Sequence, residues 1–264
     1  VDITLQLTES QRARAIAISS TSGGDVDAIR ITVKAGALVD VAGNPNLLAS
    51  DMSVLEHNDT VFPSLVSAEM WMSNGTLIVE MDEYVDVTPY VEKINFHQMY
   101  LGNALSDRVT SLVGSTATAV DGYRVTITVP EVTRVRAIEQ SGTAGGDGNS
   151  GFYLMDEGAL MDVAQNVNPS NEGIVIQEHR DNKRPRAVSA SMNFSDGVLT
   201  VIFDETLDMT PADSLVNLTR LRVETRMAED GWGMRAGWED TYNPQTNTTV
   251  IFGDTPLVAP VANV

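Results

Sequence analysis

The side chains with the clearest chemical potential are carboxylates that gather at two places in the chain, 122 residues apart. Ca²⁺ takes about six to eight oxygen ligands from carboxylates, carbonyls and water, so a fold that brings these acids together at one pole would hold this ion. The candidate ligands are Glu56, Asp59, Asp82, Glu83, Glu178, Asp181, Asp204 and Glu205. The alternative is a solvated acidic rim with turn-capping aspartates, because the spacing is not that of an EF-hand loop.

Catalytic constellations are scarce. The three histidines, His57, His97 and His179, include no pair at the i, i+4 spacing of a helical zinc site, and the chain has no cysteine nucleophile. Acid pairs such as Asp82-Glu83 suit glycoside hydrolysis, but this pair recurs as Asp204-Glu205, which favours a scaffold feature. The sequence therefore predicts a protein that is not an enzyme.

Two further signals concern surface contacts. Exposed aromatic side chains stack on sugar faces or anchor protein contacts. Trp232, Trp238 and Tyr242 fall in one segment, residues 227–244, and the alternative for them is a local core plug or a contact with a neighbouring unit. Five N-x-[ST] sequons are candidate glycosylation sites, with ordinary Asn/Thr-rich turns as the alternative: Asn58, Asn74, Asn193, Asn217 and Asn247.

Composition limits the class of protein. The 264 residues carry 17 Lys and Arg against 36 Asp and Glu, a formal net charge of −19, which argues against nucleic acid as a partner. No apolar run approaches the roughly 20 residues of a membrane span, so we expect no membrane insertion. A hydrophobic content of 42% is typical of globular domains.

An internal repeat organises the chain. Residues 1–58 share 21 identities with residues 123–180 without a gap, and residues 59–90 share 15 with residues 181–212. The sequence thus predicts three domains: a half-repeat (1–58), a complete repeat (59–180), and the N-terminal part of a further repeat (181–264).

Most of each repeat has the pattern of short strands. Asn74-Gly75 and Asp196-Gly197 indicate hairpins, because both residue types tolerate positive φ. One short helix is expected per repeat, over residues 130–140 and after the Thr8–Gln11 capping box. Strands are predicted over residues 66–72, 76–81, 93–101, 123–129, 152–155 and 173–177.

These features predict an all-β fold of tandem antiparallel β-sandwiches of about 122 residues, each with one short helix. In the second copy Gln165 replaces Gly43, so if Gly43 holds a positive φ this turn should differ between the copies.

Three motifs carry a family resemblance. The strands that end in Asp82-Glu83 and Asp204-Glu205, the Gly36–Asn44 run and the Asp59-x-x-x-Pro63 linker resemble those of bacterial-type Ig-like and cadherin-like extracellular repeats. The helix, strand and Gly-Ala-Leu order is similar to repeats of algal and protist surface proteins, including mastigoneme-like fibre proteins. The resemblance covers the whole chain and implies an extracellular or cell-surface location.

Two functions remain open at this point. The first is a structural segment of a long extracellular filament, stalk or adhesin, whose partners are other copies or neighbouring repeats of the same polymer. The second is a binding module whose pole loops hold a surface glycan or a protein. The half-repeat adds an expectation, because its apolar positions lack half of the core they should face. We expect another chain to complete it, either the next stretch of the same polymer or, by strand complementation, the 181–264 segment of a neighbour, although residues 248–254 resemble residues 1–7 and would duplicate one strand position.

Overall fold

The computed structural model describes residues 2–209, 216–217, 220, 222–223 and 250–251. The chain divides into two compact units, Val1–Arg184 and Pro185–Val264. The first unit contains the half-repeat together with the complete repeat. The domain limits at residues 58–59 and 180–181 stay a prediction.

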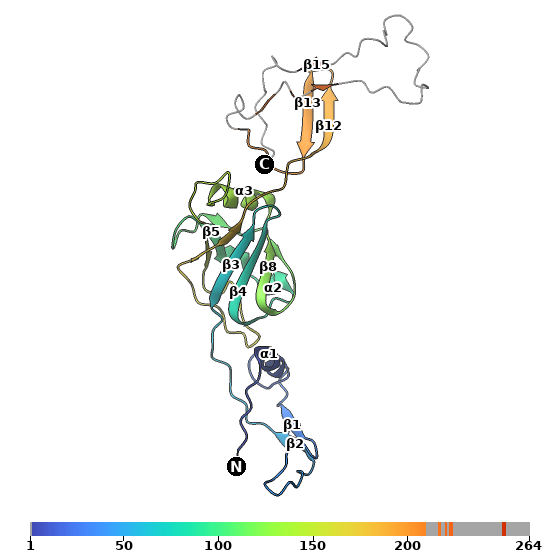
Figure 1. The fold of residues 1–264 in the computed structure, drawn as a ribbon, viewed down its shortest axis with the longest axis vertical. Helices are drawn as coiled ribbons and strands as arrows, with labels where there is room; N and C mark the ends of the chain where they lie inside the picture. The colour runs from blue at the N-terminus through green and yellow to red at the C-terminus, as the bar shows by residue number, and fades with distance from the viewer. Residues whose placement is uncertain (1, 210–215, 218–219, 221, 224–249, 252–264) are drawn as a thin grey trace, which may run out of the picture. The chain divides into compact units, whose positions relative to one another are not determined.

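The fold is all-β, with short helices between the strands, and the complete repeat contains two sheets (Figure 1). One has five strands in the order β11-β3-β4-β8-β7: Gln177–His179, Leu65–Trp71, Thr76–Val85, Gly122–Thr128 and Thr116–Ala117. The other has four strands in the order β10-β9-β5-β6: Ile174–Val175, Phe152–Met155, Met99–Gly102 and Thr110–Ser111. Apolar side chains from both sheets form one core, with Met70 and Leu77 from one sheet and Met99 and Tyr153 from the other.

Strict alternation along β4 decides which side chains face this core. Leu77, Val79 and Met81 are buried, whereas the residues between them are half-buried. The same period places Glu83 on the buried side and leaves Asp82 exposed. A carboxylate therefore reaches the inward face near the end of the sheet.

One strand pair departs from the antiparallel pattern that the sequence predicts. β11 pairs parallel with β3, with His179 opposite Trp71, so the five-stranded sheet is mixed. β3 is the first strand of the complete repeat and β11 is its last. Parallel pairing of these two strands lets the chain enter the repeat at one end of the sheet and leave it at the other.

The half-repeat shares a helix and a short strand pair with residues 123–180, but it lacks the four- and five-stranded sheets of the complete repeat. Helix α1 (Glu9–Ala17) corresponds to α3 (Glu131–Glu139). Strands β1 (Arg30–Val33) and β2 (Ala49–Ser53) pair antiparallel. Their Arg30–Ser53 pair is the counterpart of the Phe152–Val175 pair between β9 and β10. Residues 2–7, the counterparts of β8, form no strand.

The capping box at Thr8 is confirmed. The Gln11 backbone N–H donates to Thr8 Oγ1 at 3.3 Å, and the Thr8 N–H donates to Gln11 Oε1 at 2.9 Å. The predicted helix over residues 130–140 begins one residue later in the structure. Pro130 is the N-cap of α3, and Glu131 is its first helical residue.

The strand predicted over residues 93–101 is wrong in its first part. Helix α2 (Tyr90–Lys93) follows Pro89, and a 3₁₀ turn, η1 (Phe96–Gln98), precedes β5. The Asn95 side chain accepts the His97 N–H at 3.2 Å and so competes with a strand ladder.

The turns that contain Gly43 and Gln165 have the same conformation, so the predicted difference is wrong. Gly43 has φ of 84° and Gln165 has φ of 70°. In both copies an aspartate holds the turn, because the Asn44 N–H donates to Asp40 and the Asn166 N–H donates to Asp162, each at 2.8 Å. These bonds keep a non-glycine residue in the left-handed region.

In the second unit, β12 (Ala187–Asn193) and β13 (Val198–Phe203) form an antiparallel hairpin. Strands β14 (Arg222–Val223) and β15 (Val250–Ile251) form a separate pair. Both predicted hairpins exist, but only their glycines take positive φ, at Gly75 and Gly197.

Candidate functional site at the repeat junctions

A single arginine gathers acids from three segments at the junction between the half-repeat and the complete repeat. Arg12 lies on α1 and donates to Glu9 of the same helix through Nε at 2.6 Å. Its Nη1 donates to Asp59 of the linker, and its Nη2 donates to Glu83 of β4 at 2.9 Å. A helix of one repeat thereby holds the linker and a strand of the next.

Two carboxylates join Asp59 at this point. Asp59, Glu83 and Asp162 form the carboxylate cluster, in which one oxygen from each residue lies within 4.8 Å of the others. Glu83 and Asp162 are buried. Asp162 comes from the loop after β9, where it bridges to Val85 of β4.

Burial and mutual repulsion change how these groups titrate. Burial raises the pKa of Glu83 to about 7, against the opposing attraction of Arg12, and the charges of Asp59 and Asp162 raise it further. Burial also raises the pKa of Asp162, although the amide of Asn166 opposes this shift. The bonds to Glu9 and Asp59 raise the pKa of Arg12, so the guanidinium remains charged.

At the second junction the contacts of the arginine with its own helix and with the linker recur 122 residues later. Arg134 of α3 donates to Glu131 through Nε at 2.7 Å and to Asp181 through Nη1 at 2.7 Å. Nη1 also donates to the Met72 carbonyl at 2.7 Å. Arg134 is more buried than Arg12, with 6% against 28% of its side chain exposed. We call Arg12 and Arg134 the junction arginines.

Neither junction arginine is among the site residues predicted from the sequence. Both are identical between the copies, as are their partners Glu9 and Glu131. The sequence does contain a signal for them. Each predicted helix begins with a glutamate that is followed three residues later by an arginine, the spacing of an ion pair on a helix. Asp162 was missed because only the strand topology brings its loop beside β4.

Most of the other predicted metal ligands bind backbone N–H groups instead. Glu56 accepts from the Ile29 N–H at 2.6 Å, and its counterpart Glu178 accepts from Gly151 at 2.7 Å. Asp82 accepts from the Ser64 N–H at 2.6 Å, and its counterpart Asp204 accepts from Arg186 at 2.8 Å. These aspartates and glutamates hold backbone segments 18 or 27 residues away, so only Asp59 and Glu83 of the predicted ligands meet in the carboxylate cluster. Asp181 pairs with Arg134, and Glu205 lies in the second unit.

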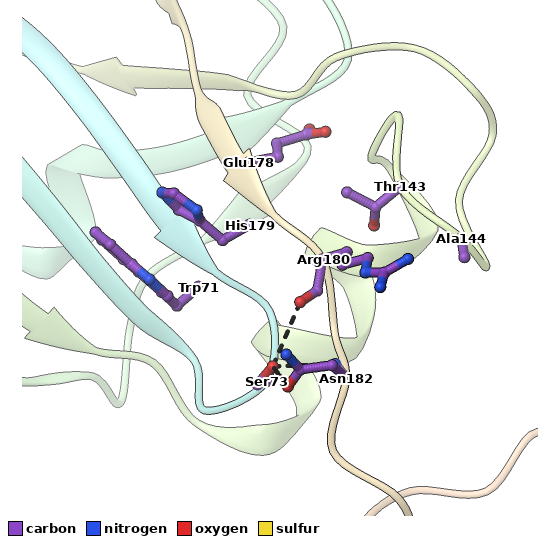
Figure 2. A pocket seen from close by; sticks show the side chains of 8 residues that line it. All are labelled: Trp71, Ser73, Thr143, Ala144, Glu178, His179, Arg180 and Asn182. Carbon is purple, nitrogen blue, oxygen red and sulfur yellow. Dashed lines mark hydrogen bonds between the residues drawn. The ribbon is translucent and has the colours of Figure 1, made fainter.

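An open pocket of about 770 Å³ lies where the chain leaves the complete repeat (Figure 2). The rings of Trp71 and His179 stack on one side of it, with centroids 4.3 Å apart. Ser73 donates to Asn182 at 3.0 Å. The pocket is lined by Trp71, Ser73, Thr143, Ala144, Glu178, His179, Arg180 and Asn182. These contacts fix the end of β11 and the start of the following linker.

Four of the five sequon asparagines lie on the surface: Asn58, Asn74, Asn193 and Asn217. Asn74 lies in the turn between β3 and β4, where a glycan meets little steric hindrance. Asn247 lies outside the described residues, as do the predicted contact residues Trp232, Trp238 and Tyr242. The binding function proposed for these aromatic residues therefore stays a prediction.

Searches against family models, curated proteins and solved structures find no match to this chain. Among the described residues, no helix has the length and apolar character needed to cross a membrane.

Proposed function

We propose that this chain is a structural segment of an extracellular filament, stalk or adhesin, built from tandem Ig-like β-sandwiches. The observation that carries the proposal is the recurrence of one junction: Arg12–Glu9–Asp59 and Arg134–Glu131–Asp181 share the same contacts at a spacing of 122 residues. A binding site for a ligand needs to occur only once, whereas a spacer needs the same joint at every boundary.

The contacts of Arg12 support a stiff joint. Its guanidinium bonds a residue of its own helix, one of the linker and one of the next repeat at the same time. Planar guanidinium groups donate in fixed directions, so these three contacts restrict bending as well as separation. The parallel pairing of β3 with β11 supports the same function, because it carries the chain from one end of the repeat to the other.

Distances between spin labels test the joint. The chain has no cysteine of its own. Labels at Val26→Cys in the half-repeat and Val120→Cys in the complete repeat therefore report the distance between these two parts. We expect a narrow distance distribution in the parent chain and a broad one after Arg12→Gln. Arg14→Gln is the matched control, because Arg14 lies exposed on the same helix. A broad distribution in the parent chain, or no difference between the two variants, would contradict a stiff spacer.

An extracellular location and bound Ca²⁺ belong to the same proposal. Exposed sequons such as Asn74 support glycosylation, and mass spectrometry of the protein from its source would show glycan masses at these residues. The carboxylate cluster offers the oxygen ligands for Ca²⁺, and Arg12 competes with the ion for Asp59 and Glu83. We therefore expect Ca²⁺ to raise the melting temperature of Arg12→Gln more than that of the parent chain. Equal shifts would count against a calcium site here.

A further inference from the structure

The linker after the complete repeat carries cations that the linker before it lacks. We call residues 180–184 the exit segment; its cationic residues, all exposed, are Arg180, Lys183 and Arg184. The counterparts of these residues 122 positions earlier are neutral: Asn58, Val61 and Phe62. Basic residues are few in a chain with a net charge of −19, so their grouping here is specific to this linker and not a feature of every junction.

The acids beside the exit segment are already engaged. Asp181 pairs with Arg134 at 2.7 Å, and both oxygens of Glu178 accept backbone N–H groups. Within the described part of the chain, the guanidinium groups of Arg180 and Arg184 make no hydrogen bond or ion pair. Two arginines are thus available to an anionic ligand, because a guanidinium donates in a fork that matches carboxylate and sulfate oxygens.

An aromatic pair lies next to these cations. Trp71 of β3 stacks on His179 of β11 with an interplanar angle of 13°, and 37% of the His179 side chain is exposed. β11 is the edge strand of its sheet, so no described strand lies beyond His179 on the side away from Trp71. The counterpart of Trp71 in the next copy is Asn193, so a repeat does not need this stack in order to fold. Exposed rings of this kind pack against the faces of sugars.

The cations and the rings lie on two sides of one strand end. In Figure 2, Arg180 points toward Ala144, whereas His179 and Trp71 lie on the other side of the chain, as expected for successive residues of an extended strand. A ligand that contacts both sides must be extended, so a single small anion does not fit. The exit segment spans at most about 14 Å, so one short stretch of polymer reaches all of its cations.

We propose that the exit segment, together with the Trp71–His179 stack, binds an acidic polysaccharide. Carboxylate or sulfate groups of the polymer pair with Arg180 and Arg184, and a sugar ring packs against the exposed part of the stack. The net charge of −19 repels polyanions, but salt screens this repulsion beyond about 8 Å, so the local cations decide. This binding function goes beyond the proposed structural function and does not depend on the stiffness of the joint at Arg12.

Binding to three immobilised polysaccharides tests the ligand. Polygalacturonate carries carboxylates, dextran sulfate carries sulfate esters, and unmodified dextran is neutral. We expect the parent chain to bind at least one of the two polyanions and not dextran, and the polyanion that binds identifies the anionic group. Equal binding to dextran, or no binding to either polyanion, would overturn the proposal.

A double variant tests the cations. Arg180→Gln with Arg184→Gln should bind the polyanion at least about tenfold more weakly than the parent chain, because two ion pairs are lost. Arg14→Gln with Arg136→Gln is the matched control, since both arginines are exposed and, within the described residues, have no partner. The control removes the same charge elsewhere and should retain the parent affinity. An equal loss in the control would show attraction by overall charge alone and would contradict the site.

Trp71→Asn tests the ring stack, because asparagine occupies this position in the next copy. We expect about fivefold weaker binding with an unchanged dependence on salt concentration, since a neutral ring releases no counterions. Trp71→Phe keeps a ring and should recover most of the affinity, which separates loss of the stack from loss of the fold. Parent affinity in Trp71→Asn would contradict the contribution of the stack.

The acidic surface of a second copy is the other anion that the arginines could hold. In that case sedimentation would show that the parent chain associates in the absence of polysaccharide, whereas the Arg180→Gln, Arg184→Gln variant stays monomeric. That result would overturn the proposal. We expect the two proteins to sediment alike.

Discussion

Residues 1–58 and 123–180 share 21 identities, yet one segment is mostly exposed and the other lies in a core. Both have a nine-residue helix at the same position. The Leu38 N–H donates to Asn46 at 2.8 Å, and its counterpart Leu160 donates to Asn168 at 2.7 Å. Local bonds of this kind need only nearby residues, so they form in both copies.

The difference between the copies lies in contacts with distant residues. Residues 123–128 form a strand because β4 and β7 flank it, whereas residues 2–7 have no strand beside them in the described part of the chain and form none. β9 lies between β5 and β10, whereas its counterpart β1 pairs with β2 alone among the strands that the structure describes. The comparison separates structure that local sequence determines from structure that needs a partner sheet.

The largest expected effect comes from shortening equivalent apolar side chains in both copies. Ile127→Ala should lower the free energy of unfolding by about 3–4 kcal/mol, because it leaves a cavity in a fully buried site. Leu5→Ala, its counterpart, should change it by less than about 0.5 kcal/mol, because Leu5 is exposed. Urea unfolding measures both, and equal losses would show that the half-repeat has a core of its own.

The junction arginines provide the second test. Arg134→Met should cost about 2 kcal/mol, because it leaves the Met72 carbonyl and Asp181 without their donor in a mostly buried site. Arg12→Met should cost about half as much, since water reaches its side chain more readily. Thermal unfolding of the two variants gives the comparison, and a larger loss for Arg12→Met would reverse our ranking of the junctions.

Acidity should affect the first junction through Glu83. Its pKa rises from 4.5 to about 7 on folding, so its contribution to stability is complete below pH 4.5 and is lost as the pH rises through about 7. The loss is at most about 3 kcal/mol. Glu83→Gln mimics the protonated form, so stability should depend less on pH across this window in the variant than in the parent chain. Parallel pH profiles for the two proteins would contradict this assignment.

The smallest expected effect concerns the matched turns at Gly43 and Gln165. Gln165→Gly should raise the free energy of unfolding by about 0.5–1 kcal/mol, because glycine takes positive φ without steric cost. Gly43→Gln should lower it by a similar amount if the bonds from Asp40 hold that turn as Asp162 holds the other. Chemical denaturation resolves changes of this size, and a loss of stability in Gln165→Gly would refute the strain assigned to that turn.

Much of the fold could be predicted from local pattern. The Thr8 cap, both hairpins and most strands follow from short stretches of residues, and the repeat identified the counterparts. The parallel β3–β11 pair could not be predicted in this way, because residues about 108 positions apart meet there and each strand alone has no directional preference.

The candidate site was only partly predictable. Asp59 and Glu83 were among the predicted ligands, because acidic residues that cluster near a repeat boundary can be recognised from the sequence alone. Their grouping with Arg12 and Asp162 depends on the alternation of β4 and on a loop that returns beside it. The bonds that Glu56 and Asp82 accept from the backbone could not be predicted for a similar reason, because their N–H donors lie 18 or more residues away.

The parallel pair of β3 and β11 also determines how the complete repeat responds to tension. A pull on the residues before Leu65 and after His179 draws the two strands in opposite directions along their length. Hydrogen bonds between them, together with the bond from the Met72 N–H to the His179 carbonyl, are then loaded in shear and must break together. A hairpin pulled open at its ends loses its bonds one pair at a time. We therefore expect the complete repeat to resist extension at the strand pair where the chain enters and leaves it.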